Sequence, residues 1–143
     1  MFSKDALKIS ENNALENNVE ITFILQDIKN IHSTDKWHVK ETFDIIVSNP
    51  PYVTVSEKGL MEKNVLDYEP ELALFVDDNN PLIFYKVIVE FAKKHLSKNG
   101  MLYFEINEMF GKEVKEILLL NGFKKVNIVK DINSRNRFVK GQL

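Results

Sequence analysis

Hydrophobic positions along the chain follow two different periods, which predict helices placed between strands. Apolar residues return every three or four positions over residues 4–16, 82–96 and 112–120, as in helices with one buried face. Short runs rich in β-branched and aromatic residues predict strands at residues 20–25, 43–48, 101–106, 123–129 and 137–140. Strands separated by helices, followed by a closing β-turn-β pair, predict an α/β sheet with an antiparallel C-terminal edge.

Capping and turn residues predict where these elements begin and end. Ser3 is a candidate N-cap of the first helix, and Pro81 precedes the second. Gly100 follows the second helix as a candidate left-handed residue. Asn121 and Gly122 end the third helix. The polar, aperiodic stretch 54–80 predicts a largely irregular segment, long enough to be a functional loop.

Composition narrows the classes of protein and site. The 143 residues predict one domain, and the net charge of −2 argues against binding nucleic acid through bulk positive charge. The chain has no cysteine, which excludes disulfides, thiolate nucleophiles and cysteine-ligated metals. No secretory signal or membrane-length apolar run is visible, so we expect a cytoplasmic protein without membrane contact. The five glycines are never closer than eleven positions, so no Gly-rich nucleotide-binding loop can be written.

The candidate chemistry lies directly after the strand 43–48. Asn49, Pro50, Pro51 and Tyr52, called the NPPY loop below, stop that strand because consecutive prolines offer no N–H groups to a sheet. Carbonyl oxygens, the Asn49 amide oxygen and the Tyr52 ring together suit a planar group bearing an NH2. Hydrogen bonds to both N–H groups would orient that nitrogen toward an electrophile, and no general base is needed before attack. A plain Pro-Pro turn with a buried tyrosine is the structural alternative.

Several segments, taken in order, carry a resemblance to a known family. They are residues 48–53 (SNPPYV), 68–74 (YEPELAL), 81–85 (PLIFY), 102–106 (LYFEI), 130–132 (KDI) and 137–141 (RFVKG). The set resembles the HemK/PrmC family of S-adenosylmethionine-dependent methyltransferases. That family methylates the side-chain amide N5 of the glutamine in the GGQ motif of peptide chain release factors. The resemblance covers essentially the whole chain and implies a Rossmann-like class I methyltransferase fold.

The resemblance also implies roles for individual residues. The NPPY loop would hold the glutamine amide as both the catalytic and the substrate-binding element, with Asn49 also near the methionine part of the cofactor. Asp27 would accept a hydrogen bond from the adenine amino group, and Ile28 would pack on the adenine ring. For Asp27, a role as a solvated cap after residues 20–25 stays open as an equal alternative.

Other chemistry-bearing residues have structural interpretations. Glu69 and Glu105 are interpreted as loop-bracing and strand-end residues, because amide methylation does not need a carboxylate pair. His32, His38 and His95 lack ligand spacing with carboxylates and are interpreted as surface residues. The apolar stripe of the third helix is interpreted as core; it consists of Val114, Ile117, Leu118 and Leu120.

The chain departs from the family at its start. The family opens its catalytic domain with a strand, a Gly-rich loop, a helix and a second strand, whereas residues 3–7 match the helix that follows them. We therefore interpret residues 1–143 as a single truncated methyltransferase catalytic domain, inactive alone and binding S-adenosylmethionine weakly or not at all. Removal of those strands leaves strand edges uncovered. We expect either self-association or direct pairing of strand 20–25 with strand 43–48.

Two other functions stay open. NPPY-type motifs also serve methyltransferases acting on adenine N6 or guanine N2 of nucleic acids, although the charge of −2 weighs against that substrate. A non-catalytic α/β interaction module is the third interpretation, favoured by the missing cofactor loop.

Overall fold

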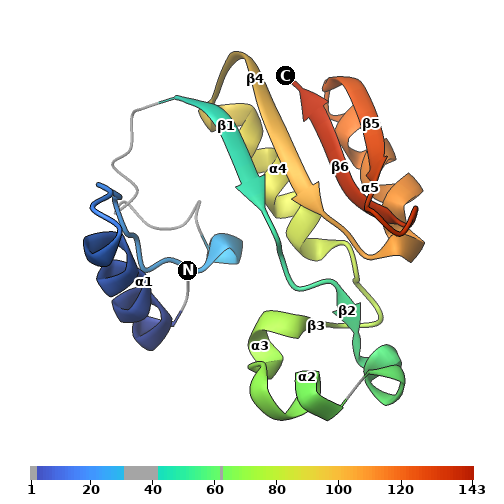
Figure 1. Cartoon of the computed structure of the whole chain (residues 1–143). Coiled ribbons are helices and arrows are strands. Elements are labelled where there is room, and N and C mark those ends of the chain that lie inside the picture. Colours follow the sequence, from blue (N-terminus) through green and yellow to red (C-terminus); the bar gives the residue numbers. More distant parts are fainter. Residues whose placement is uncertain (1–2, 31–41, 62) are drawn as a thin grey trace. The chain divides into compact units, whose positions relative to one another are not determined.

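The computed structural model describes residues 3–30, 42–61 and 63–143 (Figure 1). The chain divides into two compact units, residues 1–39 and 40–143. Each unit is described by itself below.

The first unit contains one helix in its described part, α1 (Lys4–Glu16). It begins as the sequence predicts, because the Ser3 side chain accepts a hydrogen bond from the Ala6 backbone N–H at 3.2 Å. A short 3-10 turn, η1 (Ile28–Asn30), follows later in this unit. Asp27 caps this turn, since its carboxylate accepts from the Lys29 backbone N–H at 2.9 Å and from the Asn30 side chain at 3.2 Å.

The predicted strand over residues 20–25 is wrong. The expected pairing with strand 43–48 would join the two units and stays a prediction. Residues 20–25 belong to no helix or strand, and Ile21 and Leu25 are exposed. A strand is stable only when a neighbour takes up its backbone hydrogen bonds, whatever its β-propensity. Within the described residues no neighbouring strand pairs with this segment.

The second unit is built on a four-stranded sheet in the order β1-β4-β6-β5 (Figure 1). Strand β1 (Phe43–Ser48) pairs in parallel with β4 (Leu96–Glu105). Strands β6 (Asn136–Gln142) and β5 (Lys124–Lys130) complete the sheet with antiparallel pairing. The predicted α/β sheet with an antiparallel C-terminal edge is therefore confirmed.

Two amphipathic helices, α4 (Ile83–His95) and α5 (Gly111–Leu120), pack side by side against the sheet (Figure 1). Their buried faces meet the strands in a core where the Tyr85 and Phe104 rings lie edge to face with centroids 5.1 Å apart. The largest fully buried side chains of this core are Tyr85, Val89, Leu102, Phe104, Ile106, Val114, Leu118 and Val139.

Residues 53–80 are more ordered than the sequence predicts. They form β2 (Val53–Thr54), the 3-10 turn η2 (Val55–Leu60), α2 (Lys63–Tyr68), α3 (Glu71–Leu74) and β3 (Phe75–Val76). Parallel pairing of β2 with β3 closes this segment on itself below the end of β1 (Figure 1). Local caps and one short pairing thus order a polar stretch that has no periodicity of its own.

Two details of the helix ends differ from the prediction. Asn99, with φ of 70°, takes the left-handed conformation expected of Gly100. Gly100 is needed for a different reason, because a Cβ there would lie 2.9 Å from the Ser97 carbonyl oxygen. Leu120 is 79% exposed and does not belong to the core stripe, whereas Val114 and Leu118 are fully buried as predicted.

Candidate functional site

The NPPY loop leaves β1 at the carboxyl end of the parallel pair. Ser48 is in register with Phe104 of β4, so the loop begins beside the last residues of that strand. Asn49 is exposed and Pro50 is buried. Within the described residues the Asn49 side chain makes no hydrogen bond, so its amide stays available to a ligand.

Tyr52 is tied to the end of β4 through its side chain. Its hydroxyl donates a hydrogen bond of 2.8 Å to Oε1 of Glu105. Burial and the neighbouring Glu105 carboxylate raise the pKa of Tyr52, and nearby Arg137 offsets part of that rise. The hydroxyl therefore stays protonated at neutral pH and serves as a donor that orients the ring.

Glu105 is itself held by the β5–β6 hairpin. The Arg137 guanidinium lies 3.9 Å from Glu105 Oε1 and 3.4 Å from Asp131 Oδ2. Hydrogen bonds from the Arg135 and Asn133 backbone N–H groups, with a further contribution from Arg137, lower the pKa of Asp131. Donors and acceptors therefore alternate from the NPPY loop to the β5–β6 hairpin, in the order Tyr52, Glu105, Arg137 and Asp131.

A second polar cluster lies on the backbone side of Tyr52. The side-chain N–H groups of Asn107 face the Tyr52 carbonyl oxygen at 3.2 Å and the Glu57 carboxylate at 3.0 Å. The same carboxylate accepts from the Thr54 N–H at 2.9 Å and the Thr54 hydroxyl at 2.7 Å. Burial alone would raise the pKa of Glu57, but the hydrogen bonds from Thr54 and Asn107 lower it.

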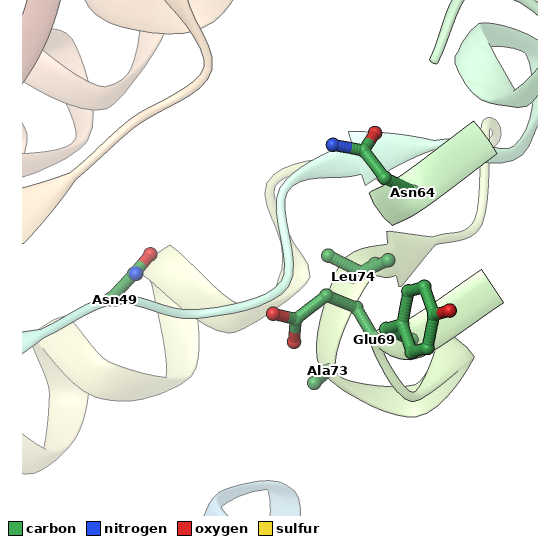
Figure 2. A pocket seen from close by; sticks show the side chains of 6 residues that line it. Asn49, Asn64, Glu69, Ala73 and Leu74 are labelled. Atoms are coloured by element: carbon green, nitrogen blue, oxygen red, sulfur yellow. The ribbon is translucent and has the colours of Figure 1, made fainter. Parts of the chain in front are cut away.

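A hollow of about 550 Å³ opens beside the NPPY loop (Figure 2). Figure 2 shows Asn49 on one side, Asn64, Ala73 and Leu74 on the other, and the Glu69 carboxylate pointing into the space between. The lining residues are Asn49, Asn64, Tyr68, Glu69, Ala73 and Leu74. The side-chain oxygens of Asn49 and Glu69 are acceptors on this wall beside the apolar Ala73 and Leu74, and such acceptors match a ligand bearing N–H donors.

The structure brings together some of the predicted site residues and not others. The four NPPY residues share one loop. Glu105 is the last residue of β4, as predicted, and it also accepts the hydrogen bond from Tyr52. Asp27 and Ile28 lie in the other unit, where the Asp27 carboxylate caps η1. The adenine roles of these two residues therefore stay predictions.

Sequence reasoning missed three bracing residues: Glu57, Asn107 and Arg137. A local signal existed for Glu57 only, because a threonine followed three positions later by a glutamate is the pattern of a capping box. The structure contains that capping box at Thr54 and Glu57. Asn107 and Arg137 meet the loop through contacts that are distant in sequence, so no local pattern reveals them.

The histidines show no metal site in the described part of the chain. His32 and His38 lie outside the described residues, and His95 stacks on Phe91 with ring centroids 4.4 Å apart. Within residues 3–30, 42–61 and 63–143 no group of three or more metal-ligating side chains gathers. No helix in that part of the chain is long and apolar enough to cross a membrane.

Comparison with known proteins decides the family. A sequence model described as Eco57I restriction-modification methylase matches residues 1–138. The chain belongs to this methylase family. The match covers both units and includes the NPPY loop together with the residues that brace it.

Two relatives of this methylase carry a more specific name. A release factor glutamine methyltransferase of Flavobacterium psychrophilum is 51% identical over 138 residues, covering 96% of the chain and 47% of the relative. One of Bacteroides thetaiotaomicron is 43% identical over 138 residues, covering 96% of the chain and 48% of the relative. The resemblance to the release factor methyltransferases is thereby confirmed. The chain spans about half the length of the curated relatives it matches.

Solved structures confirm the class I methyltransferase fold. A ribosomal protein L11 methylase from Lactobacillus delbrueckii superposes with a TM-score of 0.59 at 14% identity, covering 99% of the chain and 53% of that protein. A methyltransferase from Pyrococcus furiosus superposes with a TM-score of 0.61 at 17% identity, covering 98% of the chain and 58% of that protein. The sheet and its two helices are therefore part of a Rossmann-like methyltransferase architecture.

Proposed function

We propose that this methylase chain forms the substrate-amine part of an enzyme that methylates the glutamine amide of the GGQ motif in peptide chain release factors. The observation that carries the proposal is the NPPY loop itself. It lies beyond the carboxyl end of β1, is held by Tyr52 against Glu105, and opens on a hollow whose polar lining includes Asn49 and Glu69. The relatives named release factor glutamine methyltransferase support the choice of substrate.

The loop residues orient and polarise the amide. The Asn49 side-chain oxygen and the Pro50 carbonyl accept the two N–H bonds of the glutamine NH2, and the Tyr52 ring lies against its plane. This arrangement aims the nitrogen at the methyl donor, so a nitrogen–carbon bond forms as the donor's sulfur–carbon bond breaks. The proton leaves the nitrogen afterwards, and no general base is needed before attack.

S-adenosylmethionine would supply the methyl group. The residues proposed to hold it are Asn49 at the methionine part, Asp27 at the adenine amino group and Ile28 on the ring. The free amide of Asn49 fits this role, and the Asp27 carboxylate keeps acceptor capacity beyond its two capping bonds. A Streptococcus mutans protein solved in complex with SAH superposes with a TM-score of 0.55, 16% identity, and coverage of 100% of the chain and 73% of that protein.

A chimera tests the proposal directly. The 138 matched residues of the Flavobacterium psychrophilum relative are replaced by those of this chain, and the product is incubated with a release factor and labelled S-adenosylmethionine. We expect methylation of the GGQ glutamine and none when that glutamine is alanine. N49A should lower the rate by roughly a hundredfold, as loss of one positioned hydrogen-bonding group does.

The matched control is N80A, an asparagine that does not line the hollow. It should leave the rate of the chimera unchanged. A folded chimera that binds S-adenosylmethionine but leaves the GGQ glutamine unmodified would contradict the proposal.

A nucleic-acid substrate is the second candidate, because the matching family is described by a restriction-modification methylase. The net charge of −2 does not favour contact with a polyanion. Duplex DNA and RNA offered to the same chimera should therefore accept no methyl group. Transfer to adenine N6 or guanine N2 would favour this candidate over the release factor.

The proposal also covers assembly and location. Strand β1 lies at the edge of the sheet with Ile45 and Val47 exposed, so we propose that the chain self-associates through this edge. A release factor acts in translation, so we propose a cytoplasmic location. We propose no membrane partner and no direct nucleic-acid partner.

A further inference from the structure

Asn107 is a buried polar residue at the place where β4 ends and η3 (Glu108–Phe110) begins. It is only 9% exposed, and its neighbour Ile106 is fully buried. A buried amide is costly unless all its hydrogen-bonding groups find partners. The hydrogen-bond partners of Asn107 therefore indicate which groups this side chain holds in place.

The partners also determine how the amide is oriented. Its Oδ1 accepts from the Met109 backbone N–H at 3.0 Å, which turns Nδ2 in the opposite direction. There Nδ2 faces only acceptors, the Tyr52 carbonyl oxygen at 3.2 Å and the two Glu57 oxygens at 3.1 and 3.0 Å. The site requires a side chain with one acceptor and two donor hydrogens.

We propose that Asn107 is a positioning residue for the amide-binding loop. It fixes the Tyr52 carbonyl, and through Glu57 it fixes the backbone N–H and hydroxyl of Thr54. Tyr52 is thus held at two points, by Glu105 at its hydroxyl and by Asn107 at its carbonyl. This inference rests on the proposed function, because it names what keeps the NPPY acceptors in place for the substrate NH2.

A double substitution separates positioning from general stability. N107D places a carboxylate against that of Glu57, which repels it at neutral pH. N107D/E57Q restores a donor–acceptor pair between positions 107 and 57, and the amide oxygen introduced at position 57 can still accept from Thr54. The Tyr52 carbonyl, however, then faces an acceptor and has no donor.

The experiment uses the 16.6 kDa chain itself, whose size suits NMR. The Tyr52 carbonyl ¹³C shift, the amide hydrogen exchange of residues 52–58 and the thermal midpoint are measured for the wild type, N107A, N107D and N107D/E57Q. The matched control is N121A, which removes an asparagine that bonds the Ile117 carbonyl at the end of α5.

We expect N107A to move the Tyr52 carbonyl resonance upfield and to speed amide exchange in residues 52–58 by roughly tenfold or more. N107D should behave likewise at neutral pH and recover part of its midpoint as the pH falls. N107D/E57Q should recover its midpoint but not the carbonyl shift, and N121A should leave the loop unchanged. In the chimera, N107D/E57Q should lower kcat by about tenfold or more.

Two results would overturn the inference. One is an N107A chain whose Tyr52 carbonyl shift and loop exchange match the wild type. The other is a double variant in which the carbonyl shift returns together with the midpoint, since Asn107 would then act only through Glu57. A chimera without any methyl transfer would instead contradict the proposed function, while the carbonyl measurement would still decide the role of Asn107.

Discussion

At the scale of single residues, the arrangement around Tyr52 shows how a short loop without secondary structure is given a defined shape. Its two prolines restrict the backbone, and side chains from β4 and its continuation hold the hydroxyl and the carbonyl of Tyr52. The Asn49 amide is left without an internal partner in the described residues. The loop is therefore rigid where it is anchored and open where a ligand would bind.

Y52F tests the side-chain anchor. The variant removes the hydrogen bond to Glu105, which is made to a charged group but is only half buried, so we expect a loss of about 1–2 kcal/mol of unfolding free energy. Urea unfolding measures the loss. Y103F is the control, because the Tyr103 hydroxyl makes no hydrogen bond within the described residues; equal losses in both variants would contradict the role of Tyr52.

E57Q tests the lowered pKa of Glu57 through the pH dependence of stability. The folded pKa lies below the ordinary value of 4.5, so the unfolded chain binds the proton more readily. The stabilisation is present above the unfolded pKa and is lost as the pH falls through the folded one. Urea midpoints measured from about pH 6 to about pH 3 should therefore fall more steeply for the wild type than for E57Q; parallel curves would contradict this.

At the scale of elements, the packing of α5 on the antiparallel strands depends on a glycine. Gly141 of β6 lies against Leu118, Phe123 and Val126, and a Cβ at position 141 would come within 2.8 Å of the Leu118 side chain. Leu118 is fully buried and has little room to move. The close approach of this helix to the sheet therefore needs a residue without a side chain.

G141A should destabilise the chain by about 1–3 kcal/mol, the usual cost of overpacking a core. The matched control is G59A, since among the described residues no atom beyond the neighbouring backbone lies within 4 Å of a Cβ built at Gly59. Thermal or urea unfolding compares the two variants. A G141A chain as stable as G59A would show that α5 can shift without cost.

Strand β1 is an edge strand of the four-stranded sheet, and the prediction of self-association rests on it. Ile45 and Val47 are 59% and 74% exposed on an edge strand, a combination that favours pairing with another chain. Sedimentation velocity should show self-association of the wild type that I45K reduces. L72K, which changes an exposed leucine outside the sheet, should not reduce it, and a strictly monomeric wild type would contradict the prediction.

At the scale of the whole molecule, the residues proposed to bind the substrate and those proposed to bind the adenine of the cofactor lie in different units. The residues proposed to bind the substrate all lie in residues 40–143, whereas Asp27 and Ile28, proposed to contact the cofactor, lie in the other unit. No Gly-rich loop can be written from the five glycines. More of the residues proposed for the substrate than of those needed for the cofactor can therefore be assigned to this chain.

Titration calorimetry tests that division. We expect weak or no binding of S-adenosylmethionine by this chain alone, because few cofactor contacts can be assigned to it. The chimera with the Flavobacterium psychrophilum relative should bind the cofactor tightly. Tight, saturable binding by the chain alone would contradict the prediction.

Much of this protein could be predicted from local chemistry. The Ser3 cap, the strand 43–48, the second and third helices, the helix end at Gly122 and the NPPY loop all depend on residues close to each other along the chain. The same local reasoning failed for residues 20–25, because strand propensity does not create a strand unless a neighbour pairs with it. It also misjudged residues 53–80, whose order comes from a capping box and a two-residue pairing.

Only the tertiary structure revealed what holds the loop. The Tyr52–Glu105 and Asn107–Glu57 contacts join side chains that lie 53 and 50 positions apart, respectively, and they exist because β1 and β4 are parallel neighbours in one register. A sequence determines such contacts through its fold as a whole and not through any local pattern. For this reason the sequence located the acceptor loop, whereas the side chains that position it could be identified only from the packed sheet.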